Sequence, residues 1–316
     1  MRIFLAGGSG VVGRRLLPQL RASGHDVVAI TRQPDRAEKL SVMGAQAVVC
    51  DVFDGDRLRD VVAGARPEVV IQHLTDLPAD LNPRNLTSAY ARNDRVRGEG
   101  SANLVAAAES AGAHRYIAQN VSFWYAPEGP AVVDERARLA TDAPEPFGST
   151  VRLHAEMERR IVENPRFTGL VLRFGFWYGP GTSFAADGYT AQQVRRRRYP
   201  IVGKGGGIFS FVHVDDVVSA TIASLDRGSA GVYNIADDEP SPMHEWLPVY
   251  ADALGAPRPR RVPTWLARLI AGPFLVGQAT KMRGTSNAKA KRELGWQPRY
   301  PSWREGFPRD LGKSVG

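Results

Sequence analysis

The apolar positions of the first 174 residues form short β-branched runs that alternate with longer stretches of helical spacing. Continuous apolar runs of this kind are typical of strands buried on both faces of a parallel sheet. They predict strands at residues 2–6, 26–32, 45–51, 68–74, 114–120 and 168–174. The helical spacing predicts helices at residues 11–24, 34–44, 56–64, 88–112 and 147–160. This alternation indicates an α/β fold made of βαβ units around a doubly wound parallel sheet.

After Gly175 the alternation loosens, and glycine, proline and aromatic residues become more frequent. We therefore expect a sheet domain over residues 1–174, with return segments near 209–236, and a smaller α/β domain over residues 175–316. The smaller domain should lie over the carboxyl ends of the strands, where open α/β sheets bind ligands. Within it, residues 262–282 predict an amphipathic helical segment that closes the cleft, lines a partner surface, or both.

Composition narrows the class of protein further. The single cysteine, Cys50, excludes an internal disulfide and fits a reducing compartment. We expect a cytoplasmic protein without membrane contact, because the chain has no signal-peptide pattern and no apolar run of about 18 residues. The net charge is +8, but aromatic residues do not alternate with the basic run Arg195–Arg198, so we expect no nucleic-acid partner. The histidines are scattered without metal-ligand spacing, and no metal is expected.

The turn between the first strand and the first helix reads "AGGSGVVG". Gly7, Gly10 and Gly13 allow a tight turn, let backbone N–H groups approach a pyrophosphate, and let helix and strand pack closely. The motif follows a strand and precedes a helix, which is the context it requires. The sequence therefore predicts a Rossmann-type dinucleotide site in the 1–174 domain, with Val11 and Val12 in the same turn.

The end of the second strand, "AITRQPDR", bears on which dinucleotide binds. An acidic residue there would bind the ribose 2′-hydroxyl of NAD, but Thr31 and Arg32 occupy the position. Because a guanidinium can hold a 2′-phosphate, we expect NADP rather than NAD, unless Arg32 is only a solvated loop cation. At the end of the third strand, Asp51 either bonds the adenine amino group, with Val52 against the ring, or simply caps the next helix.

Further motifs follow in order along most of the chain: "CDV", "GSANLVAAAESAGAHRYI", "LVLRFGFWYGPG", "FSFVHVDDVVSATIASL", "GVYNIADDEP" and "AKRELGWQP". With these and the glycine turn, the chain resembles the extended short-chain dehydrogenase/reductases, the NAD-dependent epimerase/dehydratase family. The resemblance implies a Rossmann domain, a C-terminal substrate domain, and nicotinamide chemistry on a small molecule in the cleft between them. It also implies that His73, Leu74 and Gln119, at the ends of the fourth and fifth strands, approach the cofactor.

In that family a serine or threonine follows the fifth strand. A Tyr-x-x-x-Lys pair lies on the next helix, with a glutamate four residues after the lysine. Aligning on Glu156 places Arg152 at the lysine position and Gly148 at the tyrosine position, and a slip of one residue brings Phe147 there instead. No lysine occurs between residues 40 and 203, so the pair is missing. Arg152 is expected to hydrogen-bond the nicotinamide ribose in place of the lysine, and the alternative is a surface arginine of the helix.

A proton donor would then have to come from the loops after the fifth and sixth strands. Tyr125 is the first candidate, Ser122 the second and Tyr178 the third, and the alternative for each is simple packing. Aromatic side chains gather in the same loops and predict an aromatic pocket wall made by Phe123, Trp124, Tyr125, Phe174, Phe176, Trp177 and Tyr178.

These features together predict an NADP(H)-dependent oxidoreductase of a small, apolar or aromatic hydroxyl or carbonyl metabolite. The alternatives are a redox-neutral epimerase or dehydratase of the same fold, and a non-catalytic NADP(H)-binding sensor. The small residues of the 88–111 helix predict a homodimer surface, with burial against the chain's own sheet as the alternative.

Overall fold

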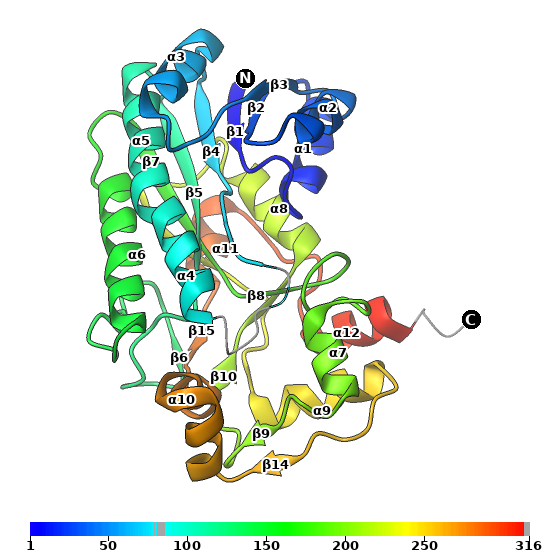
Figure 1. The fold of residues 1–316 in the computed structure, drawn as a ribbon. Coiled ribbons are helices and arrows are strands. Elements are labelled where there is room, and N and C mark those ends of the chain that lie inside the picture. The colour runs from blue at the N-terminus through cyan, green and yellow to red at the C-terminus, as the bar shows by residue number, and fades with distance from the viewer. Residues whose placement is uncertain (79, 81–85, 313–316) are drawn as a thin grey trace.

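The computed structural model describes residues 1–78, 80 and 86–312. Seven strands form its central sheet: β1 Arg2–Ala6, β2 Asp26–Thr31, β3 Gln46–Val49, β4 Val69–Gln72, β5 Arg115–Val121, β7 Thr168–Phe174 and β12 Gly231–Ile235. They are all parallel and run in the order β12-β7-β5-β4-β1-β2-β3 (Figure 1). The first six lie where the apolar runs predicted strands, and the α/β Rossmann-type fold is confirmed.

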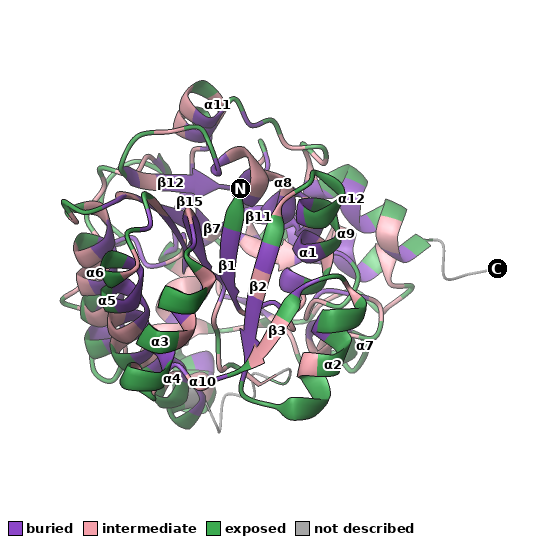
Figure 2. Cartoon of the chain, turned by 90° about the horizontal axis from the view of Figure 1, so that it is seen from above, coloured by how far each residue is buried: buried purple, intermediate pink, exposed green. Residues whose placement is uncertain are grey.

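Helices cover both faces of the sheet, and the strands are buried between them (Figure 2). One face carries α1 Gly13–Ala22, α2 Pro34–Val42, α8 Val214–Ala223 and α11 Ala288–Leu294. The other carries α3 Gly55–Ala65, α4 Leu86–Arg95, α5 Ser101–Ser110 and α6 Phe147–Val162. Alternate residues of each strand enter alternate cores: Ile3 and Leu5 pack toward α1, whereas Phe4 and Ala6 pack toward α3 and α5.

The predicted helix at residues 88–112 is interrupted. A π-helical turn, Val96–Gly100, separates α4 from α5. The small residues of α5 pack inside the chain, with Ala107 and Ala108 buried in the core that α5 shares with α3 and the sheet. The homodimer surface therefore stays a prediction.

A second apolar core lies beyond the sheet, in the C-terminal half of the chain. It is built around Phe211, Trp246, Trp303 and Phe307. The elements of this half and of the loops beside it are β6 Val132–Val133, β8 Phe176–Tyr178, α7 Tyr189–Arg195, β9 Ile201–Val202, β10 Ile208–Phe209, β11 Phe211–His213, β13 Ser241–Pro242, α9 Met243–Ala253, β14 Arg261–Val262, α10 Thr264–Lys281, β15 Gly284–Thr285 and α12 Trp303–Leu311. Helix α10 is broken at Gly272, which has φ 80° and ψ 163° and precedes Pro273.

Candidate active site

The glycine loop joins β1 to α1 at the carboxyl edge of the sheet. Gly7 has φ 102°, and a Cβ there would lie 2.4 Å from the carbonyl oxygen of His73. A Cβ on Gly13 would lie 2.4 Å from the carbonyl oxygen of Gly7. No side chain caps α1, and in the described chain the amides of Val11, Val12 and Gly13 have no hydrogen-bond partner. Free amides at a helix N-terminus are the donors that a pyrophosphate needs, so these residues fit a dinucleotide.

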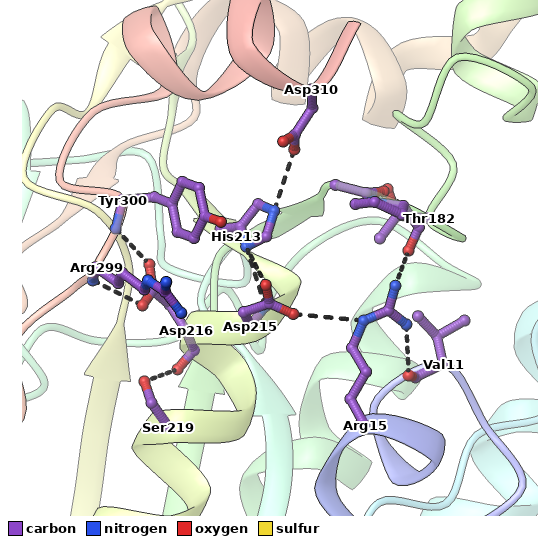
Figure 3. A network of polar contacts seen from close by, with 12 residues as sticks. Val11, Arg15, Thr182, His213, Asp215, Asp216, Ser219, Arg299, Tyr300 and Asp310 are labelled. Atoms are coloured by element: carbon purple, nitrogen blue, oxygen red, sulfur yellow. Dashed lines mark hydrogen bonds and ion pairs between the residues drawn. The ribbon is translucent and has the colours of Figure 1, made fainter. Parts of the chain in front are cut away.

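A polar network braces this loop against the C-terminal half of the chain (Figure 3). Arg15 of α1 donates to the backbone carbonyl of Val11 at 3.0 Å and to that of Pro180 at 2.7 Å. Its Nε lies 3.4 Å from the carboxylate of Asp215 in α8. The buried His213 accepts the Asp215 amide through Nδ1, so its Nε2–H donates to Asp310 of α12, at 3.1 Å. The network links the glycine loop to α8 and α12.

The adenosine end of the site lies at the ends of β2 and β3. The Arg32 guanidinium is half exposed and lies 3.7 Å from the carboxylate of Asp76. Asp51 accepts the amide of Phe53 through Oδ1 at 3.0 Å, and Val52 is buried beneath it. Asp51 thus forms a local turn and does not cap the next helix, because the N-cap of α3 is Asp54, which accepts the Arg57 amide at 3.1 Å. The other carboxylate oxygen of Asp51 makes no bond in the described chain, so the adenine interpretation stays a prediction.

The ends of β4 and β5 meet beneath the glycine loop. His73 is buried between Gln119, with 3.0 Å from Nδ1 to Oε1, and Thr221 of α8, with 3.1 Å from Nε2 to Oγ1. Burial lowers the pKa of His73 to about 4, so its ring is uncharged at neutral pH. Leu74 packs against the core beneath α3 and α5. These contacts hold the strand ends at the glycine loop.

Helix α6 presents a buried face to the sheet. Thr150, His154 and Glu158 follow one another at four-residue spacing, which puts them on one side of the helix, and all three are buried. Glu158 forms a buried ion pair with Arg173 of β7, whose Nε donates to it at 2.6 Å. It also accepts the side-chain amide of Asn120, at 2.7 Å.

Arg152 lies on the other face of α6, and this corrects its predicted place. Its guanidinium donates to the carbonyl of Thr141 at 2.9 Å and to the carboxylate of Glu145 at 2.6 Å, and half of the side chain is exposed. Glu156, on which the alignment rested, also lies toward solvent and pairs with Arg159 at 2.9 Å.

The glutamate of α6 that reaches the sheet is Glu158, and the alignment therefore shifts by two residues. Counting back four and eight residues from it puts His154 at the family's lysine position and Thr150 at its tyrosine position. The Tyr-x-x-x-Lys pair is missing in this register too.

Sequence reasoning missed a buried polar cluster between α6 and the end of α4. The hydroxyl of Thr150 donates to Asp94 at 2.6 Å. Arg97, in the π-helical turn, is buried and donates to the carbonyl oxygen of Gln119 through Nη1, while its Nε has no partner. Burial raises the pKa of Asp94 and lowers that of Arg97 to about 10, so Arg97 stays charged. The π-helical turn that brings Arg97 inward has no signal in the apolar pattern.

The protonation of His154 follows from its neighbours. The Asn120 amide nitrogen donates to Glu158, so its oxygen faces Nδ1 of His154, which must carry the proton. Burial, with the charges of Arg97 and Arg173, lowers the pKa of His154 to about 3. The ring is therefore neutral, and its unprotonated Nε2 is buried without a partner.

The three predicted proton donors do not come together. The Tyr125 hydroxyl donates to Asn234 at 2.8 Å and accepts from Arg173 at 2.7 Å, and burial raises its pKa. Ser122 is buried at the end of β5, and its hydroxyl makes no hydrogen bond in the described chain. The Tyr178 hydroxyl is buried without a partner, and its ring packs edge-on against Phe307 of α12.

An aromatic cluster lies beside this polar region. The rings of Phe147 in α6 and Phe274 in α10 stack with centroids 3.6 Å apart. Tyr90 of α4 packs edge-on against Phe147 at 5.7 Å, and Trp124 packs against Phe274 at 5.8 Å. The predicted pocket wall contributes Trp124, whereas the other three rings come from helices that the sequence analysis did not connect.

Among the described residues, no group of three or more histidine, cysteine, aspartate and glutamate side chains could hold a metal ion. No helix among them has the length and apolar character needed to cross a membrane.

Comparison with known proteins agrees with this geometry. The model of the NAD dependent epimerase/dehydratase family matches residues 3–236. A 3-diazoavenalumate denitrifying reductase from Streptomyces sp. is 45% identical over 311 residues, which cover 98% of this chain and 100% of that protein. A 4-hydroxy-2-methyl-3-oxo-4-farnesyl-3,4-dihydroquinoline-1-oxide ketoreductase from Stigmatella aurantiaca is 29% identical, over 81% of this chain and 74% of its own. The structure of a UDP-glucose 4-epimerase from Thermotoga maritima is 19% identical and superposes with a TM-score of 0.78 over 100% of both chains.

The glycine loop, the family model and these relatives together place the chain among nucleotide-binding Rossmann oxidoreductases that use a nicotinamide cofactor on a small molecule. The chain belongs to the NAD-dependent epimerase/dehydratase family, as its motifs indicated.

Proposed function

We propose that this protein is an NADPH-dependent reductase that removes nitrogen from an aromatic diazo compound and leaves hydrogen in its place. The relative that is 45% identical over the whole chain is a denitrifying reductase of a diazo substrate. The aromatic cluster of Tyr90, Trp124, Phe147 and Phe274 suits an aromatic ring. The observation that carries the proposal is the buried face of α6, which has Thr150 and His154 at the positions of the family's tyrosine and lysine.

Replacement of N₂ by hydride at a diazonium-type carbon needs no proton donor for its atoms and charges to balance. When bound, NADPH supplies a hydride. At a diazonium-type carbon, a C–H bond forms from the hydride and its electron pair. The C–N bond breaks, and its electrons leave with N₂. A carbonyl reduction, in contrast, needs a proton at the new alkoxide, which is the task of the family's tyrosine. The absence of that tyrosine therefore favours loss of N₂ over carbonyl reduction.

In this proposal the chain's own residues bind the cofactor and orient the substrate. The free amides of Val11, Val12 and Gly13 hold the pyrophosphate, and Arg32 holds the 2′-phosphate. His154 offers the bare Nε2 as an acceptor for a hydroxyl group where the family has a donating lysine. The buried charge of Arg97 provides positive potential at the same place.

We assign Tyr125 to positioning, because both of its hydrogen bonds lie within the Arg173 and Asn234 network. Ser122, whose hydroxyl makes no bond in the described chain, is the group of the β5 loop best placed to bond a substrate oxygen. Tyr125→Phe should keep turnover within about threefold of the unmodified protein, since no proton is drawn from the phenol. A loss of about a hundredfold, with a native melting profile, would make Tyr125 the proton donor after all.

The reaction itself is tested with the purified protein, NADPH and an aryl diazonium carboxylate. We expect one NADPH oxidised for each N₂ released, and deuterium in the product when the nicotinamide C4 carries deuterium. A reaction without protein measures the background reduction. Product formed without net NADPH oxidation would indicate the redox-neutral alternative. Tight binding of NADPH without turnover of diazo or carbonyl substrates would indicate a sensor.

A further inference from the structure

The first half of α10 carries an apolar face that the active site does not use. Trp265 is 66% exposed, Leu269 77% and Ile270 75%, and Leu266 is exposed beside them. On a helix these four positions form one stripe, and Ala267 is buried on the opposite side. The stripe lies on α10 at the end of the molecule away from the N-terminus, near β9 and β14 (Figure 1).

Two basic segments meet just before this helix, and one of them contains the stripe. Residues 188–214 and 253–292 contain no aspartate or glutamate, although the chain as a whole has 33 acidic residues. The first holds the exposed run Arg195–Arg198, and the second holds the exposed Arg258, Arg260 and Arg261. Strands β9 and β14 pair in parallel, and the amide of Ile201 donates to the carbonyl of Arg260 at 2.8 Å. The pairing brings the two basic segments together immediately before α10 begins.

We propose, in place of the expectation of no membrane contact, that the apolar stripe and these arginines form a docking surface for a lipid bilayer that contains anionic lipids. An exposed helix with tryptophan and aliphatic residues on one face and arginines at its border has the composition of an interfacial membrane helix. Anionic headgroups complement the arginines, and the stripe enters the region below them. A second copy of the chain fits less well, because a shared apolar face would bring two sets of arginines together.

The same helix reaches the aromatic cluster. After the break at Gly272 and Pro273, Phe274 stacks on Phe147. A protein docked through the first half of α10 would therefore hold the aromatic cluster close to the bilayer. The docking proposal does not depend on the reductase reaction, and it is tested without substrate.

The test is sedimentation of the full-length protein with vesicles of phosphatidylcholine alone or with added phosphatidylglycerol. We expect binding to the anionic vesicles only, weakened by added salt. The variant with Trp265, Leu269 and Ile270 changed to serine should lose binding. The variant with Arg258, Arg260 and Arg261 changed to glutamine should bind about a hundredfold more weakly. Val42→Ser, at an apolar residue that is 84% exposed on α2, is the matched control and should bind normally.

Each of three results would overturn the proposal. The first is no binding to anionic vesicles by the unmodified protein. The second is binding that survives both sets of substitutions, since the surface would then lie elsewhere. The third is light scattering that shows a dimer broken by the serine substitutions, because the stripe would then be covered by a second copy.

Discussion

The glycine loop and helix α6 differ in how much of their family's pattern they keep. In the loop the decisive contacts involve backbone atoms, with the carbonyl of His73 at Gly7 and that of Gly7 at Gly13. On α6 the helix and its buried glutamate remain, while the side chains at the two reacting positions are Thr150 and His154. A backbone site tolerates almost no substitution, whereas a helix face can change its chemistry and keep its packing. Cofactor binding and reaction type can therefore change separately.

The largest expected effect is on the free energy of unfolding, at Glu158 on the buried face of α6. Glu158→Gln removes the charge that pairs with the buried Arg173 and should lower the free energy of unfolding by about 3–5 kcal/mol. Glu156→Gln, on the exposed face, should change it by less than about 0.5 kcal/mol. Chemical denaturation of both variants measures the difference. Equal stabilities would mean that the two faces of α6 are assigned the wrong way round.

The next largest expected effect is on NADPH affinity, at the glycine loop. Gly13→Ala puts a methyl group against the carbonyl of Gly7, and NADPH should bind at least about a hundredfold more weakly because the amides move. Gly64→Ala is the control, since a Cβ there meets no atom within 4 Å. Calorimetric titration of both variants tests the expectation. Unchanged affinity in Gly13→Ala would show that the cofactor does not depend on this turn.

The buried histidines make stability depend on pH. The pKa of His73 is about 4 and that of His154 about 3, both below the ordinary histidine value of 6.5, so between pH 6.5 and these values the unfolded chain binds more protons than the folded protein. The stability they contribute is present above pH 6.5 and is lost as the pH falls, by about 2 kcal/mol for each histidine at pH 5.

His154→Gln should remove about half of this pH dependence, as measured by unfolding between pH 7 and pH 5. His114→Gln, at an exposed position, should leave it unchanged. If His154→Gln keeps the full slope, His154 is protonated in the folded protein and α6 has kept a cation at the lysine position.

The smallest effect concerns the adenosine end. NADP(H) should bind at least about tenfold more tightly than NAD(H), because Arg32 stands where an acid would select NAD. Arg32→Asp should reduce or reverse that preference, and Arg59→Asp, an equal charge change on the exposed side of α3, should not. Titration with both cofactors decides the matter, and equal affinities in the unmodified protein would contradict the assignment.

The sequence was sufficient for six of the seven strands and for the glycine loop, but not for the buried face of α6. Strand periodicity and glycine spacing are local patterns, and they located β1 to β5, β7 and the dinucleotide turn. Glu156 and Glu158 are both glutamates on one helix, and only tertiary packing tells which of them meets Arg173. The alignment on Glu156 put Arg152 at the lysine position, whereas the alignment on Glu158 puts His154 there. Arg97 was missed for a related reason, since a π-helical turn changes which residues face inward without changing the apolar pattern.

Strand β12 has a consequence for synthesis. It pairs with β7 at the edge of the sheet, although 56 residues separate Phe174 from Gly231. As the chain leaves the ribosome, β7 emerges long before its outer partner and presents an open, apolar edge in the meantime. The segment that makes β8, β9 and β11 emerges while that edge is free, and β9 still lacks its partner β14 at that stage. A fragment ending at residue 174 would keep the edge open permanently, and expression of the dinucleotide-binding part alone calls for an end point beyond Ile235.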